Sequence, residues 1–169
     1  MEDDDPKSVE IMLGYLYTGQ YNKSLDENEE LRRQLLIQAL TYNLADKYDI
    51  PALMELAKKR FKATLSRTPT LGEYLSIVSD VYTMPAPTNN LRAITSEYAR
   101  LKLREMMQGS ENHEDLRAAL EDVPDFAFDV LQLFIKDPLR GRCSSCGPNI
   151  GAEALQARCK SCGKGGISL

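Results

Sequence analysis

The chain has 169 residues, with 21 Lys plus Arg, 25 Asp plus Glu and 43% hydrophobic residues, a globular composition that excludes disordered, collagen-like and fibrous classes. It contains no run of about 18 apolar residues and no signal peptide, so we expect no membrane association and an intracellular location, in the nucleus or cytoplasm. The single histidine, His113, lies in a polar stretch and is interpreted as a solvated side chain. With one histidine and no phosphate loop or nucleophile elbow, the sequence favours a protein that is not an enzyme, with no catalytic residues.

Charge divides the chain into two parts. Residues 1–135 hold 15 basic and 23 acidic side chains, whereas residues 136–169 hold six basic and two acidic ones. All four cysteines also lie in the second part. This change of chemistry predicts a domain boundary between residues 135 and 136.

Apolar residues recur at intervals of three and four through residues 1–135, which predicts a mainly α fold. Asp5 and Pro6 favour the start of a first helix, which Gly19 would end. We expect one face of this helix to consist of Val9, Met12, Leu13, Leu16 and Tyr17. Leu16 and Tyr17, at the end of the helix, are interpreted as core residues. A second helix is predicted over about residues 29–48, ended by the Ile50-Pro51 corner, and a third over about residues 53–65.

Thr70 and Glu73 have the spacing of a capping box, which predicts a fourth helix to about residue 83. After the Pro85-Ala86-Pro87 break, the apolar pattern predicts a longer helix over about residues 90–107, with Leu91, Ile94, Tyr98 and Leu101 on one side. Two shorter helices complete the helical part. One spans about residues 114–121, and Pro124 opens the other.

Two sequence blocks carry a family resemblance: DDPKSVEIMLGYLYTGQY at residues 4–21 and LADKYDIPAL at residues 44–53. Residues 1–66 resemble the second half of a BTB/POZ domain in the form common in fungal proteins. Residues 67–135 look like the helical extension that follows the BTB box. The resemblance implies a protein-interaction module that binds a protein partner, such as a cullin-type ubiquitin ligase scaffold or a transcriptional regulator.

The match covers only part of that family's fold. The first half of a BTB domain contributes the mixed sheet, most of the dimer interface and part of the cullin-facing surface, and it would precede Met1. We therefore expect an exposed apolar patch and marginal stability for residues 1–66, and a homodimer only if the missing half is supplied. A truncated gene model, or a partner that completes the fold, would explain such a start.

The cysteines form two CxxCG units separated by 12 residues, and the ligand set is Cys143, Cys146, Cys159 and Cys162. A two-residue spacer lets both thiolates of a unit face one ion, and four thiolates suit tetrahedral Zn²⁺. The spacing therefore predicts a small zinc ribbon over residues 136–169, with one structural zinc per chain and no open coordination position. Two disulfides, or redox-active or iron–sulfur cysteines, are the alternatives, and an intracellular location disfavours the disulfides.

Basic residues flank these cysteines: Arg140, Arg142, Arg158, Lys160 and Lys164. They give an alternative hypothesis, a zinc-ribbon regulator that binds nucleic acid and uses the helical part as a platform. Four thiolates and one Zn²⁺ reduce the tail's charge from +4 to about +2, and the tail has no aromatic residue to stack a base. We therefore favour a structural or protein-binding ribbon and regard nucleic-acid binding as the runner-up.

Overall fold

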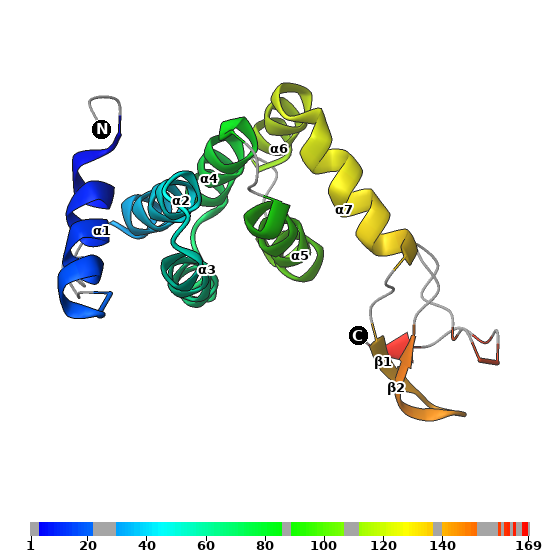
Figure 1. Cartoon of the computed structure of the whole chain (residues 1–169). Coiled ribbons are helices and arrows are strands. Elements are labelled where there is room, and N and C mark those ends of the chain that lie inside the picture. The colour runs from blue at the N-terminus through cyan, green and yellow to red at the C-terminus, as the bar shows by residue number, and fades with distance from the viewer. Residues whose placement is uncertain are drawn as a thin grey trace. The chain divides into compact units, whose positions relative to one another are not determined.

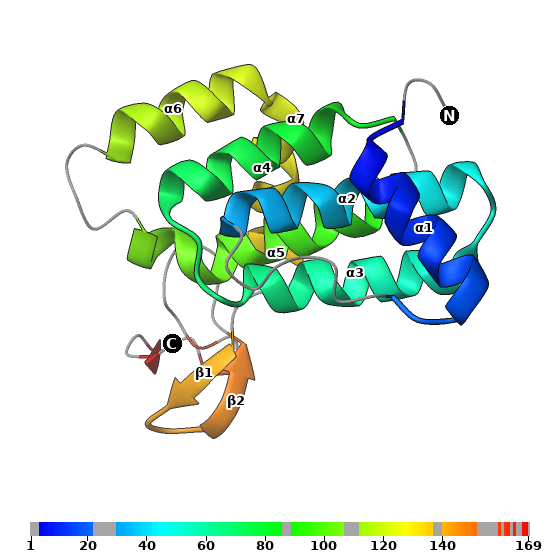
Figure 2. The ribbon, with the colours of Figure 1, turned by 90° about the vertical axis from the view of Figure 1, so that its left-hand side faces the viewer.

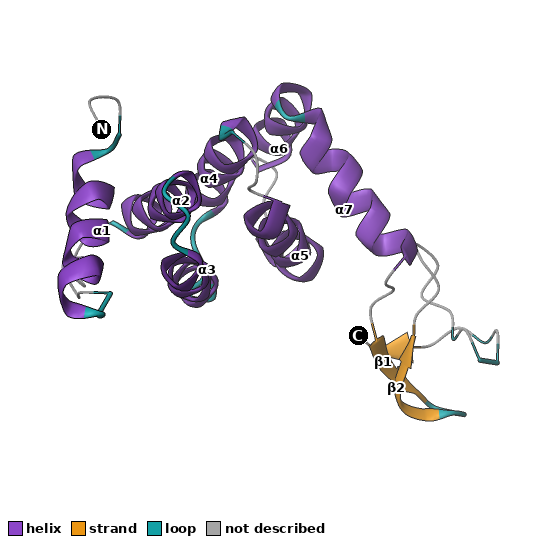
Figure 3. Cartoon of the chain, in the orientation of Figure 1, coloured by secondary structure: helices purple, strands orange, loops and turns teal. Residues whose placement is uncertain are grey.

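The computed structural model describes residues 4–21, 30–85, 89–106, 112–136 and 140–151, together with residues 159, 161, 162, 164, 167 and 168. These residues form seven helices followed by three short strands (Figures 1 and 3), so the prediction of a mainly α fold is confirmed. The elements are α1 (Pro6–Thr18), α2 (Leu31–Lys47), α3 (Pro51–Leu65), α4 (Leu71–Thr83), α5 (Asn89–Met106), α6 (Asn112–Asp122), α7 (Pro124–Lys136), β1 (Arg140–Cys143), β2 (Gly147–Gly151) and β3 (Ile167–Ser168). Among the described residues, no helix has the length and apolarity needed to cross a membrane.

The chain divides into two compact units, Met1–Phe126 and Ala127–Leu169. The units divide near the start of α7, after Phe126, whereas the change in charge along the sequence falls at the end of this helix, between residues 135 and 136. The two positions differ because charge composition reports the surface of a segment, while a compact unit is defined by packing. Phe126, in the first turns of α7, is fully buried in the first unit.

Helix α2 is the central element of the first unit, where it packs against α1, α3 and α4 (Figure 2). Its buried face is wide and includes Leu35, Ala39, Tyr42 and Ala45, none more than 1% exposed. Polar side chains also lie in this interior, and Gln38 Nε2 donates a hydrogen bond of 2.9 Å to Thr64 Oγ1. A helix with neighbours on three sides needs more than one apolar stripe. This explains why the buried residues of α2 lie around most of its circumference.

Two helix starts predicted from the sequence are confirmed. The Asp5 carboxylate accepts a hydrogen bond from the Ser8 backbone N–H at 2.8 Å, with Pro6 following as the first residue of α1. At α4, the Glu73 N–H donates to Thr70 Oγ1 at 3.3 Å while the Thr70 N–H donates to Glu73 Oε2 at 2.8 Å. These bonds satisfy N–H groups that have no partner within the helix.

The predicted buried face of α1 is wrong at its C-terminal end. The helix buries Ser8, Ile11 and Met12, whereas Leu16 is 57% exposed and Tyr17 is 88% exposed. Leu13 is exposed as well. Of the five residues predicted to share the buried face, Met12 alone is buried, Val9 is half-buried, and the other three have no cover among the described residues. Leu13, Leu16 and Tyr17 are therefore exposed apolar side chains on α1, whereas the wide apolar stripe of α2 is buried.

An aromatic cluster joins α4, α5 and the start of α7 within the first unit. The ring of Tyr74 lies 5.2 Å from that of Tyr98 and 6.3 Å from that of Phe126, while Tyr82 lies 5.7 Å from Phe126. The Tyr74 hydroxyl donates a 2.8 Å hydrogen bond to the Thr95 carbonyl oxygen. Burial raises the pKa of Tyr74 well above its usual value of 10, because this environment disfavours the phenolate.

Candidate metal centre

A short hairpin positions the first two cysteines. Strands β1 and β2 pair antiparallel, with Cys143 at the end of β1 and Cys146 in the turn that leads to β2. Gly147 begins β2 with a φ of +93°, a conformation that favours glycine. Residues 144–146 form a turn that this glycine follows, whereas the corresponding Gly163 of the second CxxCG unit lies outside the described residues.

The third strand brings the C-terminal part of the unit beside the hairpin. The sheet has the order β2-β1-β3, and β3 pairs antiparallel with β1, opposing Ile167 to Cys143. The Cys159 N–H donates a 2.9 Å hydrogen bond to the Lys164 carbonyl oxygen, which closes a turn around Cys162. Residues 19 positions apart in the chain, Cys143 and Cys162, thereby come into contact.

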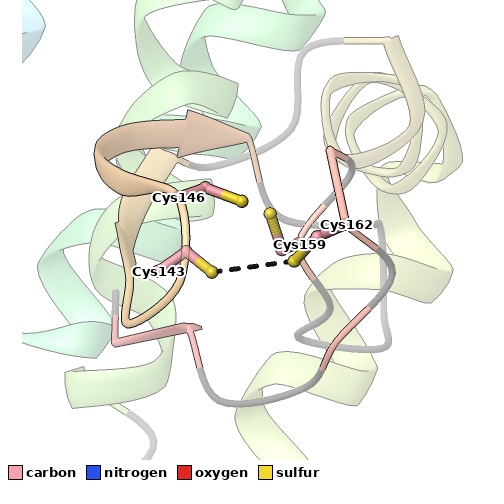
Figure 4. Close-up of side chains that lie close together, drawn as sticks. All are labelled: Cys143, Cys146, Cys159 and Cys162. Carbon is pink, nitrogen blue, oxygen red and sulfur yellow. Dashed lines mark hydrogen bonds between the residues drawn. The ribbon is translucent and has the colours of Figure 1, made fainter.

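The four cysteine sulfurs converge on one point, as Figure 4 shows. All four Sγ atoms lie within 4.8 Å of one another, and those of Cys143 and Cys162 are 3.9 Å apart. A tetrahedral ion with Zn–S distances of about 2.3 Å places its sulfurs about 3.8 Å from each other. The predicted ligands thus form one cluster that could hold a metal ion.

Half of the cluster is buried. Cys143 and Cys159 are 2% and 1% exposed, with Ile150 packed against them, while Cys146 and Cys162 face solvent. Among the described residues of this unit, the two buried thiols and one aliphatic side chain are too small a group to form a stable core. A metal ion would supply the missing cohesion.

The thiols have different acidities in the absence of an ion. Hydrogen bonding with Cys162 is the main cause that raises the pKa of Cys146 to about 12. Burial acts against the thiolate of Cys159, but backbone N–H groups of Cys162 and Ser161 donate to its sulfur and lower its pKa to about 7. Four neighbouring thiolates repel one another, so the fully ionised cluster requires a compensating cation.

The other predicted features are placed as follows. Arg140, Arg142 and Lys164 are exposed in the second unit, while Arg158 and Lys160 lie outside the described residues. His113 is exposed near the start of α6 in the first unit.

Sequence reasoning missed an apolar groove of about 420 Å³ between α3 and α5, which we call the α3–α5 groove. The sequence pattern places Leu91, Ile94, Tyr98 and Leu101 on one side of α5 but does not show which part of that side the neighbouring helices cover. Leu91 at the start of that stripe is fully buried, but Leu101 at its end is 53% exposed and lines the groove. No feature of the sequence distinguishes the exposed end of this side from its buried end.

A scan against protein-family models and searches of curated proteins and solved structures found no significant match to this chain.

Proposed function

We propose that the chain is a non-enzymatic protein-interaction module of the BTB/POZ type whose C-terminal unit is held together by one structural Zn²⁺. The observation that carries the metal site is the convergence of four cysteine sulfurs within 4.8 Å. All four ligands would come from the protein, so the ion would have no open position for substrate or an activated water. Zinc fits this all-sulfur set better than the oxygen-preferring ions Mg²⁺ and Ca²⁺.

Native mass spectrometry of the purified chain tests the metal site. We expect one zinc per chain. Replacement of Cys146 by Ser should lower zinc affinity by more than about 100-fold, because loss of a direct ligand should exceed the 10–100-fold effect usual for a residue that only hydrogen-bonds to a ligand. Ser144→Ala, in the same turn, is the matched control and should retain the ion. A chain without metal that is two or four mass units light would indicate disulfides and contradict the zinc assignment.

The interaction function is supported by the solvent-facing stripe of α1, defined by Leu13, Leu16 and Tyr17. Three neighbouring apolar side chains left in water favour burial against another protein. We propose that the partner is a cullin-type scaffold or a transcriptional regulator, and that the complex is intracellular, where thiols remain reduced and able to bind zinc.

Affinity capture with the full chain tests this surface. A cullin-type scaffold or a transcriptional regulator, identified by mass spectrometry, should be recovered with the unmodified chain and lost with Leu16→Glu. Ala118→Glu introduces the same charge at an exposed position of α6 and should leave recovery unchanged. Equal recovery with both variants would contradict a role for the α1 stripe.

The exposure of Arg140, Arg142 and Lys164 supports nucleic-acid binding as a second candidate function. Binding through these side chains would release counterions, so affinity for DNA or RNA should fall steeply with salt. A double variant, Arg142→Glu and Lys164→Glu, should abolish such binding while leaving protein capture intact. Salt-independent capture of protein, with no retention on DNA or RNA, would contradict nucleic-acid binding and support the protein-interaction module alone.

A further inference from the structure

The four cysteines of the metal centre differ in their access to solvent. Cys143 and Cys159 are 2% and 1% exposed, whereas Cys146 and Cys162 are exposed. Each CxxC unit therefore has one buried and one exposed cysteine. A reagent dissolved in water reaches the cluster at Cys146 or Cys162, because the other two cysteines are buried.

The two exposed cysteines also have the less constrained backbone. Cys146 and Cys162 each lie in a turn. By contrast, Cys143 is on β1, which pairs with both β2 and β3, and the Cys159 N–H donates a hydrogen bond to the Lys164 carbonyl oxygen. A turn at the surface adjusts more easily than a paired strand, so the exposed sulfurs can approach each other with little disruption of the sheet.

The exposed sulfurs lie close enough to form a disulfide after a small movement. The Sγ atoms of Cys146 and Cys162 are no more than 4.8 Å apart and point toward each other across the cluster (Figure 4). A disulfide has an S–S distance of about 2.05 Å, so these two atoms must approach by less than about 3 Å. The Cys143 Sγ is 3.9 Å from that of Cys162, so distance alone does not select the pair.

The order of the chemical steps selects the pair. Oxidation begins at an exposed sulfur, and a neighbouring thiolate then attacks the oxidised atom. A start at Cys146 can end in a bond to any of the other three cysteines, and so can a start at Cys162. The bond between Cys146 and Cys162 is the one product that both starts share, and it leaves the buried cysteines in place.

We propose that Cys146 and Cys162 form a disulfide when a peroxide oxidises them, and that this disulfide releases the bound ion. The inference rests on the proposed function, since it concerns the regulation of the same zinc site. In a start at Cys146, the thiolate attacks one peroxide oxygen, the O–O bond breaks and hydroxide leaves, which gives a sulfenic acid. The Cys162 thiolate then attacks that sulfur, forms the S–S bond and displaces a second hydroxide. The two sulfurs lose two electrons, and hydrogen peroxide takes up two protons and becomes two waters.

Loss of these two thiolates removes half of the ligand set. Cys143 and Cys159 remain, and two ligands are fewer than the four of a structural zinc site. The second unit then loses the cohesion that the ion supplies. A thiol reductant cleaves the disulfide and restores the four ligands, so the change is reversible.

Peroxide treatment of the zinc-loaded full chain tests the release. The chain is loaded with zinc in the presence of a reductant, which is then removed, and hydrogen peroxide is added. A chromogenic chelator should detect one zinc released per chain, and dithiothreitol followed by zinc should restore binding.

Peptide mapping of the oxidised chain tests which cysteines pair. Remaining thiols are blocked with N-ethylmaleimide before digestion with trypsin, which cuts after Arg142, Arg158 and Lys160. Mass spectrometry should find residues 143–158 linked to residues 161–164. Fragmentation of the linked peptide should place the disulfide at Cys146 and the maleimide at Cys143.

A double variant, Cys146→His and Cys162→His, tests the role of exposure. It retains two cysteines and two histidines, a ligand set that zinc accepts, so it should still bind one ion. Its thiols are both buried, and peroxide should release its zinc at least about 10-fold more slowly. Ser145→Ala combined with Ser161→Ala changes exposed positions in the same turns, keeps all four thiols and should release zinc as the unmodified chain does.

Three outcomes overturn the proposal: zinc retained after peroxide, a disulfide that includes Cys143 or Cys159, or equally fast release from the double histidine variant. A reduced chain that binds no zinc before peroxide is added contradicts the proposed function instead. The peptide map then still decides whether Cys146 and Cys162 are the pair that peroxide oxidises.

Discussion

Gly147 has a φ of +93°, and a Cβ at this position would meet no atom within 4 Å. Any effect of adding a methyl group would therefore come from backbone strain alone. Two of the cysteines depend on this turn, because Cys143 precedes it and Cys146 lies within it. Backbone conformation at one residue is thus coupled to the geometry of the metal site.

We predict that Gly147→Ala weakens zinc binding by about 5- to 30-fold, since an L-residue in left-handed geometry costs about 1–2 kcal/mol. Competition with a chromogenic zinc chelator measures the change. Gly72→Ala is the control, because a Cβ there also meets open space but the backbone has no positive φ. An unchanged affinity for Gly147→Ala would show that the turn does not constrain the ligands.

Tyr74 gives a prediction about alkaline pH. Burial raises its pKa in the folded chain, so the unfolded chain releases the phenolic proton first, near pH 10. The stability that this side chain contributes is fully present below pH 10 and is lost as pH rises further. Tyr74→Phe removes the hydrogen bond to Thr95 and should cost about 1 kcal/mol at pH 8.

The deficit of Tyr74→Phe relative to the unmodified chain should shrink as pH rises above about 10, because phenylalanine does not titrate. Urea unfolding at pH 8 and at pH 10.5 measures it. Tyr17→Phe, at an exposed position, should match the unmodified chain at both values. A deficit that stays constant with pH would contradict a buried, neutral Tyr74.

At the scale of elements, helix starts and packing faces behave differently. The starts of α1 and α4 depend on local hydrogen bonds, so a few adjacent residues are enough to predict them. The face that a helix buries depends on its neighbours, as α1 illustrates. Its stripe has the period of a buried face, but the side of α1 that packs on α2 is the one with Ser8, Ile11 and Met12.

We predict that Thr70→Ala destabilises the chain by about 1 kcal/mol, because it leaves an N–H group at the start of α4 without a partner. Equilibrium unfolding in urea measures the change. Ser79→Ala removes an exposed hydroxyl from the same helix and should be neutral or slightly stabilising. Equal stability of Thr70→Ala and the unmodified chain would mean that the capping box contributes nothing.

At the scale of the molecule, the two compact units have different sources of cohesion. The first unit contains buried aromatic and aliphatic side chains such as Tyr42, Phe61 and Tyr74. The described residues of the second unit bury only two cysteines with Ile150 packed against them. Burial of apolar surface stabilises the first unit, whereas an ion bound by the four cysteines would stabilise the second.

We therefore predict that a zinc chelator unfolds the β1–β3 sheet and leaves the helices of the first unit intact. Backbone amide signals of residues 140–151 should collapse toward random-coil shifts in an NMR spectrum, while helical ellipticity at 222 nm should change little. Restoring zinc should reverse the change, and Mg²⁺ should not. Loss of the helical signal on chelation would show that the units fold as one.

Much of the fold could be predicted because its signals are local. Seven helices were predicted at close to their observed bounds, since Pro6, Gly19, Pro51, Thr70 and Pro124 mark helix ends through their own backbone chemistry. The cysteine cluster was predicted from spacing, since two CxxC units have few ways to present four sulfurs. The exposed end of α1 and the α3–α5 groove depend on which helices are adjacent, and no single residue encodes that.

The sequence by itself determined the helical class of the fold, the helix ends and the set of four converging cysteines. Each of these follows from interactions between residues close in the chain, or from a ligand spacing that sterics restrict. Only the tertiary structure decided that α2 is the central helix, that Leu16 and Tyr17 face solvent and that the first residues of α7, up to Phe126, belong to the first unit. Burial is a property of the whole packed body, because a side chain leaves water only when another element covers it.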